Sequence, residues 1–305
     1  MKPAELLFLS QEDTIAAGAL DMSLVVPTME EVFRLHHQGD YVLPSKSVLR
    51  WGDKESESIR GRINSMPGWI GGDIQAVGIK WIASSPMNPF KHDLPRASAV
   101  IVLNHPSTLL PIAVMDGTTI SAARTGANTG VAARYLAKPG SRALGLIGAG
   151  VQNRTQLLAL KYAMPSLEDI RVYDIDLNRA KAFSHEMSHK IGNEIRVVMS
   201  AYEAVYGADI FVSATVTQEP IVKADWIEPG VFYSHVGSHE CEFEVINRMD
   251  KLVVDDWEEI KHRGVVLAEA HVQGKTITLT NAVKGVSIEF HPGAKRYFVE
   301  KGVLK

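Results

Sequence analysis

Two different patterns of apolar and polar residues follow one another along the chain. Through about the first hundred residues, short apolar runs alternate with turn signals such as Gly39-Asp40 and Gly71-Gly72-Asp73. One helix is predicted over residues 27–37, and the runs at 77–82 and 97–103 are typical of strands. The second run is rich in branched residues, so we expect it to be well buried. This part of the chain predicts a mixed α+β domain.

The pattern becomes regular in the second part of the chain. Residues 118–137 are mostly small and predict a closely packing helix, which Pro139-Gly140 ends. Helix-like segments separate most of the strand-like runs that follow, at 143–147, 170–173, 195–199, 210–213, 231–236 and 252–254. Strands that alternate with helices favour right-handed βαβ units. We therefore predict an α/β fold with a doubly wound parallel sheet, and a closing helix over 285–305.

Composition and charge narrow the class of function. The 305 residues are 46% hydrophobic and 22% charged, which is enough apolar material for two ordinary domains. The formal net charge is -3, so the chain offers no basic stripe to neutralise a phosphate backbone. We therefore expect no nucleic-acid partner and favour a small-molecule substrate.

Cysteine content and apolar run lengths bear on the compartment. Cys241 is the only cysteine, so no disulfide forms within the chain and a reducing compartment suits it. The apolar run at residues 6–9 is too short for a signal peptide, and no run approaches the roughly 18 apolar residues of a membrane span. We expect a cytoplasmic protein without a membrane span.

A glycine-rich turn follows the strand-like run at 143–147. Its residues are Gly148-Ala149-Gly150-Val151-Gln152-Asn153, and a helix-like segment comes directly afterwards. Gly148 permits a tight turn, and Gly150 lets the backbone approach a pyrophosphate at the positive end of the helix. Asn153 stands where this fingerprint usually has a third glycine or alanine. The order predicts a Rossmann nucleotide site, although an ordinary strand-to-helix turn also explains a Gly-x-Gly sequence.

Asp174 makes the nucleotide reading more specific. It ends the next strand-like run, 174 − 150 = 24 residues after Gly150, where the carboxylate that binds the ribose is expected. A carboxylate there accepts hydrogen bonds from ribose hydroxyls and repels a 2′-phosphate, so NAD is preferred to NADP. The alternative for Asp174 is a helix N-cap or a turn residue. Arg179 is either a solvated cation on a helix or a phosphate ligand.

Longer motifs, spread over nearly the whole chain, identify a family. They are Lys80-Trp81-Ile82, Pro86-Met87-Asn88-Pro89, Met115-Asp116-Gly117-Thr118, Ser121-Ala122-Ala123-Arg124-Thr125 and the glycine turn. Through them the chain resembles the ornithine cyclodeaminase and μ-crystallin family. Within that family it is most similar to the aminocarboxyethyl-glutamate dehydrogenases, in Pro44-Ser45-Lys46, Arg96-Ala97-Ser98, Ala214-Thr215-Val216-Thr217 and Val253-Val254-Asp255-Asp256-Trp257.

The resemblance implies a division into two domains. A substrate and dimerisation domain of mixed α+β structure spans residues 1–124 and is completed by 283–305. A Rossmann NAD-binding domain spans residues 125–282. A homodimer is expected on the same ground. The segment 267–279 is shorter than in relatives, which puts the loop on the substrate side in doubt.

The resemblance also implies a set of binding residues. In the family, the residues at Lys46 and Lys80 hold the carboxylate of an amino acid, and the one at Arg124 lies between the substrate and the cofactor phosphate. Lys46 is alternatively an ordinary lysine of a polar loop, and Arg124 a solvated cation on its helix. Lys80 lies in an apolar strand, where a lysine is costly unless it is paired. Arg96 either binds a phosphate or pairs with Asp93. The cofactor-binding set implied by the family comprises Arg124, Thr125, Gly148, Ala149, Gly150, Val151, Gln152, Asp174, Thr215 and Val236.

The chain departs from the family at Gly237-Ser238-His239-Glu240, where cyclodeaminases have an aspartate that handles the substrate amine. Glu240 is a candidate general base, and so is His239, whose pKa is ordinarily near neutrality. Either is alternatively a surface loop residue. His235 and His239 have a metal-like spacing, but no third ligand is evident, so we predict no metal.

Together these features predict an NAD-dependent enzyme that oxidises an amino acid, or an N-substituted amino acid, at Cα through an imine. The missing aspartate favours a dehydrogenase over an ornithine cyclodeaminase, which is an ammonia-lyase that gives proline. A ketimine or imine reductase is the same reaction in reverse. A non-catalytic NAD(P)-dependent binding protein is the alternative from another class.

Overall fold

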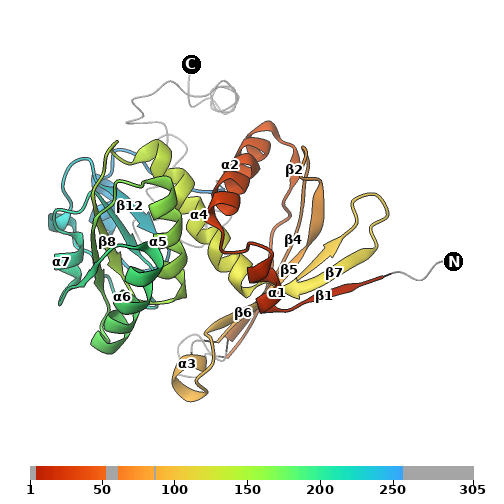
Figure 1. The fold of residues 1–305 in the computed structure, drawn as a ribbon, viewed down its shortest axis with the longest axis horizontal. Coiled ribbons are helices and arrows are strands. Elements are labelled where there is room, and N and C mark those ends of the chain that lie inside the picture. The colour runs from red at the N-terminus through yellow and green to blue at the C-terminus, as the bar shows by residue number, and fades with distance from the viewer. Residues whose placement is uncertain (1–4, 53–60, 86, 257–305) are drawn as a thin grey trace. The chain divides into compact units, whose positions relative to one another are not determined.

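The computed structural model describes residues 5–52, 61–85 and 87–256. By its internal contacts the chain divides into two units, Met1–Cys241 and Glu242–Lys305. The first unit holds both β-sheets, which Figure 1 shows as separate layers joined through helices. In the part described of the second unit, α8 spans Phe243–Arg248. No helix among the described residues is long and apolar enough to cross a membrane.

The sheet nearer the N-terminus has seven strands and is mostly antiparallel. Its order is β1-β7-β6-β5-β4-β2, with β3 also paired to β4, and only β1 and β7 run parallel. The strands are β1 Leu7–Leu9, β2 Tyr41–Val42, β3 Ser47–Trp51, β4 Gly61–Ile70, β5 Ala76–Ser84, β6 Ala97–Asn104 and β7 Pro111–Asp116. The helices in this part of the chain are α1 Gln11–Ala16, α2 Met22–Gln38 and α3 Asn88–Lys91. The predicted mixed α+β structure of this part of the chain is confirmed.

Strand β6 is where the prediction of burial was wrong. Of its residues only Ala99 is buried, whereas Val100 keeps 42% of its surface exposed. Side chains alternate between the two faces of a strand. On one face, Ala99 and Ile101 contact the start of α4, which spans Thr118–Leu136. The other face of β6 is partly exposed within the described part of the chain, so the branched run here is covered mainly on one side.

The second sheet is parallel, with the order β10-β9-β8-β11-β12. Its strands are β8 Ala143–Ile147, β9 Asp169–Tyr173, β10 Ile195–Val197, β11 Ile210–Ser213 and β12 Phe232–His235. The connecting helices are α5 Val151–Ala163, α6 Leu177–Ile191 and α7 Ala201–Val205, and a short 3-10 turn covers Ala224–Trp226. The predicted run at 252–254 is not a strand.

Helices cover both faces of this sheet, as the doubly wound prediction requires. Leu144 and Leu146 pack in one core with Leu157 of α5 and Phe183 of α6. Gly145 lies between these two leucines and faces the opposite side, where a Cβ atom would overlap the carbonyl oxygen of Ala204 in α7. The Rossmann-type α/β sheet is therefore confirmed.

Helix α4 packs backbone to backbone against α5 (Figure 1). A Cβ atom on Gly126 would overlap the main chain of Thr155, and the Thr155 hydroxyl donates to the carbonyl of Ala122 at 2.9 Å. The small residues of α4 are therefore what lets the two helices approach. The predicted domain boundary at residues 124/125 falls inside this continuous helix, and the division itself stays a prediction. The segments 267–279, 283–305 and 285–305 lie outside the described residues.

Candidate functional site

The glycine turn after β8 has the geometry of a dinucleotide-binding turn. Gly148 has a φ of +97°, and a Cβ there would lie 2.7 Å from the carbonyl oxygen of Ala214 and 3.1 Å from a Thr215 methyl group. Gly150 has a φ of -84° and nothing within 4 Å of the position of a Cβ. Gly148 is therefore required by the fold itself. Gly150 faces open space in front of α5.

The N-terminus of α5 is available to an anion. Gly150 is the N-cap residue and supplies no side-chain hydrogen bond, and Val151 behind it is 61% exposed. The first N–H groups of a helix have no partner within the helix and carry a partial positive charge. Ala149 lies between the two glycines and is buried, and Gln152 lies in the first turn of α5.

Asn153 explains why the third glycine of the fingerprint is dispensable. The side chain is fully buried, and its Nδ2 donates to the carbonyl oxygens of Ile147 at 2.8 Å and Gly148 at 2.6 Å. The amide thus satisfies two carbonyls where the strand ends and the turn begins. Sequence reasoning noted the departure at Asn153 but did not foresee this function.

Asp174 lies directly after β9 and faces the glycine turn. Its Oδ2 accepts from the backbone N–H of Ala149 at 2.7 Å, and its Oδ1 accepts from the N–H of Asp176 at 2.9 Å. The N-cap of α6 is Asp176, so the alternative that Asp174 caps this helix is wrong. Arg179 is about half exposed and lies 3.5 Å from Asp176, which agrees with a surface cation.

These residues fit a dinucleotide. The turn, the free end of α5 and the Asp174 carboxylate all lie at the carboxyl ends of parallel strands, where open α/β sheets bind nucleotides. Thr215 contacts Gly148, and the N–H of Val236 donates to Ser213 at 3.0 Å, so both residues also lie at this edge. The N–H donors at the start of α5 suit a pyrophosphate, and the acceptor oxygens of Asp174 suit the hydroxyls of a ribose.

A second group of predicted residues gathers around Lys80 on β5. The Lys80 ammonium donates to the hydroxyl of Ser121 on α4 at 3.1 Å. Burial lowers the pKa of Lys80, and the charges of Arg124 and Lys46 act in the same direction, so that together they bring it to about 8. Three cations from β5, α4 and the segment before β3 therefore lie within electrostatic reach of one another.

Local structure explains how the cations converge. Lys80 pairs across the sheet with Ile101, so it lies on the face that α4 covers. Ser121 and Arg124 are three residues apart on α4, and residues at this spacing share one side of a helix. Thr125 follows, and its hydroxyl donates to the carbonyl of Ser121 at 2.8 Å. Sequence reasoning missed Ser121, although its spacing from Arg124 was a usable signal.

Arg96 is not brought into this group by any described contact. It directly precedes β6, and burial lowers its pKa, but its charge is not among the causes of the Lys80 shift. Within the described residues no ion pair joins Arg96 to Asp93. The predicted role of Arg96 in binding stays a prediction.

The segment after β12 contains both candidate bases, in opposite environments. Glu240 is fully buried, whereas His239 is exposed. His235 Nε2 lies 3.6 Å from the Glu240 carboxylate, and burial lowers the pKa of the His235 imidazole while that carboxylate opposes the shift. No group of three metal-ligating side chains occurs among the residues that the structure describes.

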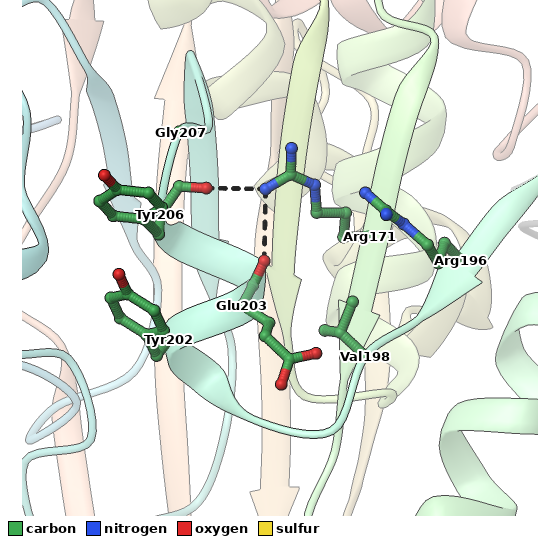
Figure 2. Close-up of a pocket in the computed structure, with 7 residues that line it drawn as sticks. All are labelled: Arg171, Arg196, Val198, Tyr202, Glu203, Tyr206 and Gly207. Atoms are coloured by element: carbon green, nitrogen blue, oxygen red, sulfur yellow. Dashed lines mark hydrogen bonds between the residues drawn. The ribbon is translucent and has the colours of Figure 1, made fainter.

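A hollow of about 450 Å³ lies apart from all predicted site residues (Figure 2). Arg171 on β9 donates there to the carbonyl oxygens of Glu203 at 3.3 Å and Tyr206 at 2.7 Å, at the C-terminal end of α7. Arg171 and Arg196 both pair with Asp169. Arg171 thus holds the end of α7, and Arg196 is engaged with Asp169.

The Rossmann-type sheet with its glycine turn is typical of a dinucleotide-binding protein, and the separate cluster of cations suits an anionic substrate. The chain matches the ornithine cyclodeaminase/mu-crystallin family over residues 7–288, and it belongs to this family. Over 273 residues it is 36% identical to N-((2S)-2-amino-2-carboxyethyl)-L-glutamate dehydrogenase of Staphylococcus aureus. This match covers 89% of the present chain and 81% of the relative.

Two solved structures are similar in both sequence and fold. The first is Δ1-pyrroline-2-carboxylate reductase of Thermococcus litoralis in complex with NADH and L-proline. It is 38% identical with a TM-score of 0.74, and the match covers 80% of this chain and 74% of that one. The second is an archaeal alanine dehydrogenase dimer with bound NAD, 33% identical with a TM-score of 0.74, over 88% of this chain and 82% of that one.

Proposed function

We propose that this protein is an NAD-dependent oxidoreductase that oxidises an amino acid, or an N-substituted amino acid, at Cα through an imine. The observation that carries the proposal is the gathering of Lys46, Lys80 and Arg124, a site for a carboxylate, in the same chain as a dinucleotide turn. The aminocarboxyethyl-glutamate dehydrogenase and alanine dehydrogenase relatives support this reaction class.

NAD is held by the carboxyl edge of the parallel sheet. The N–H groups at the start of α5 bind the pyrophosphate, for which Gly150 leaves room. Asp174 accepts hydrogen bonds from the adenosine ribose, and Thr215 and Val236 line the path toward the nicotinamide. When bound, NAD supplies the acceptor for a hydride. The solved relatives with NADH and NAD support this choice of cofactor.

The cation cluster positions the substrate. Lys80 and Lys46 bind the substrate carboxylate, and Arg124 lies between the substrate and the cofactor phosphate. Fixing the carboxylate orients Cα and its hydrogen, which contributes through the entropy of orientation and through charge. His239 is exposed in the segment after β12 and takes the proton of the substrate amine as general base.

A substrate screen tests the proposed function. Purified protein is incubated with NAD and a panel of amino acids, including N-carboxyalkyl amino acids, while the absorbance of the reduced cofactor is followed. Net formation of NADH with one of them is the expected result. Proline and ammonia without net NADH identify a cyclodeaminase, and NAD binding without any turnover identifies a binding protein; either result contradicts the proposal.

The same site also suits the reverse reaction. The chain is 38% identical to a pyrroline-2-carboxylate reductase, and a reductase binds the imine carboxylate with the same cations. Incubation with NADH and cyclic imino acids tests this second candidate. Faster turnover in this direction at neutral pH would make reduction the main activity.

The lowered pKa of Lys80 predicts a pH dependence. Below pH 8 the amine is charged and binds a carboxylate, and above this pH the charge is progressively lost. We therefore expect kcat/KM to fall as pH rises through about 8. In Lys80→Arg the guanidinium keeps its proton, so the fall should move to higher pH. An unchanged position of the fall in this variant would assign it to another group.

We propose that the active form is a homodimer that buries the open face of the seven-stranded sheet. Trp81, on the face opposite Lys80, is 56% exposed beside Val100, which is 42% exposed. A hollow of about 320 Å³ lies there, lined by Ser65, Ile79, Trp81, Val100 and Val102. The dimeric alanine dehydrogenase supports this assembly.

The dimer proposal predicts the effect of a charge on that face. In Trp81→Glu a carboxylate replaces an exposed indole, so a monomer is expected where the unaltered protein is a dimer. Light scattering coupled to gel filtration measures both masses. Tyr135→Glu, on a side chain of α4 that is 70% exposed, is the control and should remain dimeric. A dimeric Trp81→Glu protein would place the interface elsewhere.

A further inference from the structure

Glu240 is buried deep at the edge of the sheet that carries the proposed cofactor site. It has no exposed surface, and it is the only acidic or basic residue among the buried residues of the described chain. A buried carboxylate is costly unless hydrogen bonds compensate it. The hydrogen bonds that compensate the buried Glu240 carboxylate therefore indicate its structural role.

Both carboxylate oxygens of Glu240 accept hydrogen bonds, and the donors come from two separate segments. Oε1 accepts from the backbone N–H of Thr215, after β11. Oε2 accepts from the Ser213 hydroxyl at 2.8 Å and from the backbone N–H of Gly237, after β12, also at 2.8 Å. One side chain thus joins the loops that follow two neighbouring strands.

The backbone around the carboxylate is shaped to receive it. A Cβ atom on Gly237 would overlap the carboxylate of Glu240, so the glycine makes room for it. The main-chain carbonyl of Glu240 also accepts from the N–H groups of Ile221 at 3.0 Å and Val222 at 2.9 Å. The returning segment is therefore fixed at both its backbone and its side chain.

The same contacts reach the glycine turn. Ala214 and Thr215 pack directly on Gly148, where a Cβ would lie 2.7 Å from the Ala214 oxygen. A hydrogen bond that fixes Thr215 therefore also fixes the segment that packs against Gly148 in the glycine turn. On the other side, Gly237 is the neighbour of Val236, which is proposed to line the cofactor path.

We infer that Glu240 is a positioning residue that clamps the Thr215 and Gly237 loops against the glycine turn and so preforms the NAD site. The inference rests on the proposed NAD-dependent function. It replaces the sequence-based hypothesis that Glu240 is the general base. A base must reach a substrate proton, whereas this carboxylate has no exposed surface and uses both oxygens within the protein.

Glu240→Gln tests the clamp, because the amide keeps the shape but turns one acceptor into a donor that faces the loop N–H groups. We expect the dissociation constant for NADH, measured by calorimetry, to rise at least about fivefold. At saturating cofactor, kcat should stay within about threefold of the unaltered protein, since chemistry itself is not the function of a positioning residue.

Unchanged NADH affinity in Glu240→Gln would overturn the clamp. If kcat at the same time falls about a hundredfold or more and one limb of the pH profile is missing, Glu240 acts as a general base instead. If the unaltered protein binds no NADH at all, the proposed function fails, and this outcome is distinct from a failure of the clamp alone.

Matched variants keep the test decisive. Gly237→Ala inserts a methyl group into the position of the carboxylate from the other side and should weaken NADH binding similarly. The double variant should be little worse than either single one, because both break the same contact. Glu228→Gln, an exposed glutamate, is the control and should bind normally. If Glu240→Gln does not fold, Ser213→Ala replaces it in the test, because it removes one of the hydrogen bonds to the Glu240 carboxylate. Normal NADH affinity in Ser213→Ala would then overturn the clamp.

Discussion

Lys80→Ala is expected to lower kcat/KM for the amino-acid substrate by about two to three orders of magnitude while leaving NAD affinity within about twofold. Lys80 is the central cation of its cluster, with Arg124 and Lys46 nearby. Loss of a largely desolvated charge that pairs with a carboxylate typically costs several kcal/mol, about 2 to 5. The remaining cations keep part of the attraction but not the geometry.

Steady-state kinetics and calorimetry with NAD measure the two halves of this prediction. Lys181→Ala, on an exposed position of α6, is the control for a lost lysine charge and should retain full activity. Thermal unfolding confirms that the Lys80 variant is folded. Full activity in Lys80→Ala would contradict the proposal that Lys80 binds the substrate carboxylate. A parallel loss of NAD binding would show that Lys80 acts on the cofactor.

Gly150→Ala is expected to fold normally and yet to bind NAD about tenfold or more weakly. The backbone at Gly150 has a φ of -84°, which alanine adopts without strain, and a Cβ there meets nothing within 4 Å. The methyl group would occupy only the space that we assign to the pyrophosphate. Ligand binding should therefore suffer while stability does not.

Gly148→Ala is the matched comparison, because its effect should be on folding. At Gly148 the φ is +97° and a Cβ would lie 2.7 Å from the Ala214 oxygen, so alanine is strained and crowded without any ligand. Thermal unfolding and NAD titration of both variants separate the two cases. Normal NAD affinity in Gly150→Ala would contradict the position proposed for the pyrophosphate.

The parallel sheet was predictable because its strands are short apolar runs with clear ends. The bounds of β8 and β11 agree with the predicted 143–147 and 210–213, where glycine or polar segments follow buried residues directly. Helix α2 was harder. The prediction placed Pro27 at its start, whereas Asp21 caps the helix and Pro27 lies inside it. Proline favours a first turn but does not fix it.

Those site residues that belong to a sequence motif could be predicted, whereas those that join the site only through tertiary packing could not. Lys80 was singled out by the family resemblance, and its place in an apolar strand, where a lysine needs a partner, supported that prediction. The turn residues follow from a local fingerprint. The partners themselves were not accessible. Ser121 meets Lys80 only through the packing of α4 on the sheet, and Glu240 becomes buried only because its segment returns to β11. Both depend on tertiary contacts that a local pattern does not encode.

Hydride transfer from Cα is the step on which the account depends, and an isotope label follows it directly. The substrate from the amino-acid screen is supplied with deuterium at Cα, and the reduced cofactor is analysed by mass spectrometry. The account predicts that the deuterium is found on the nicotinamide of NADH. Deuterium released to water, with no labelled cofactor, would contradict it.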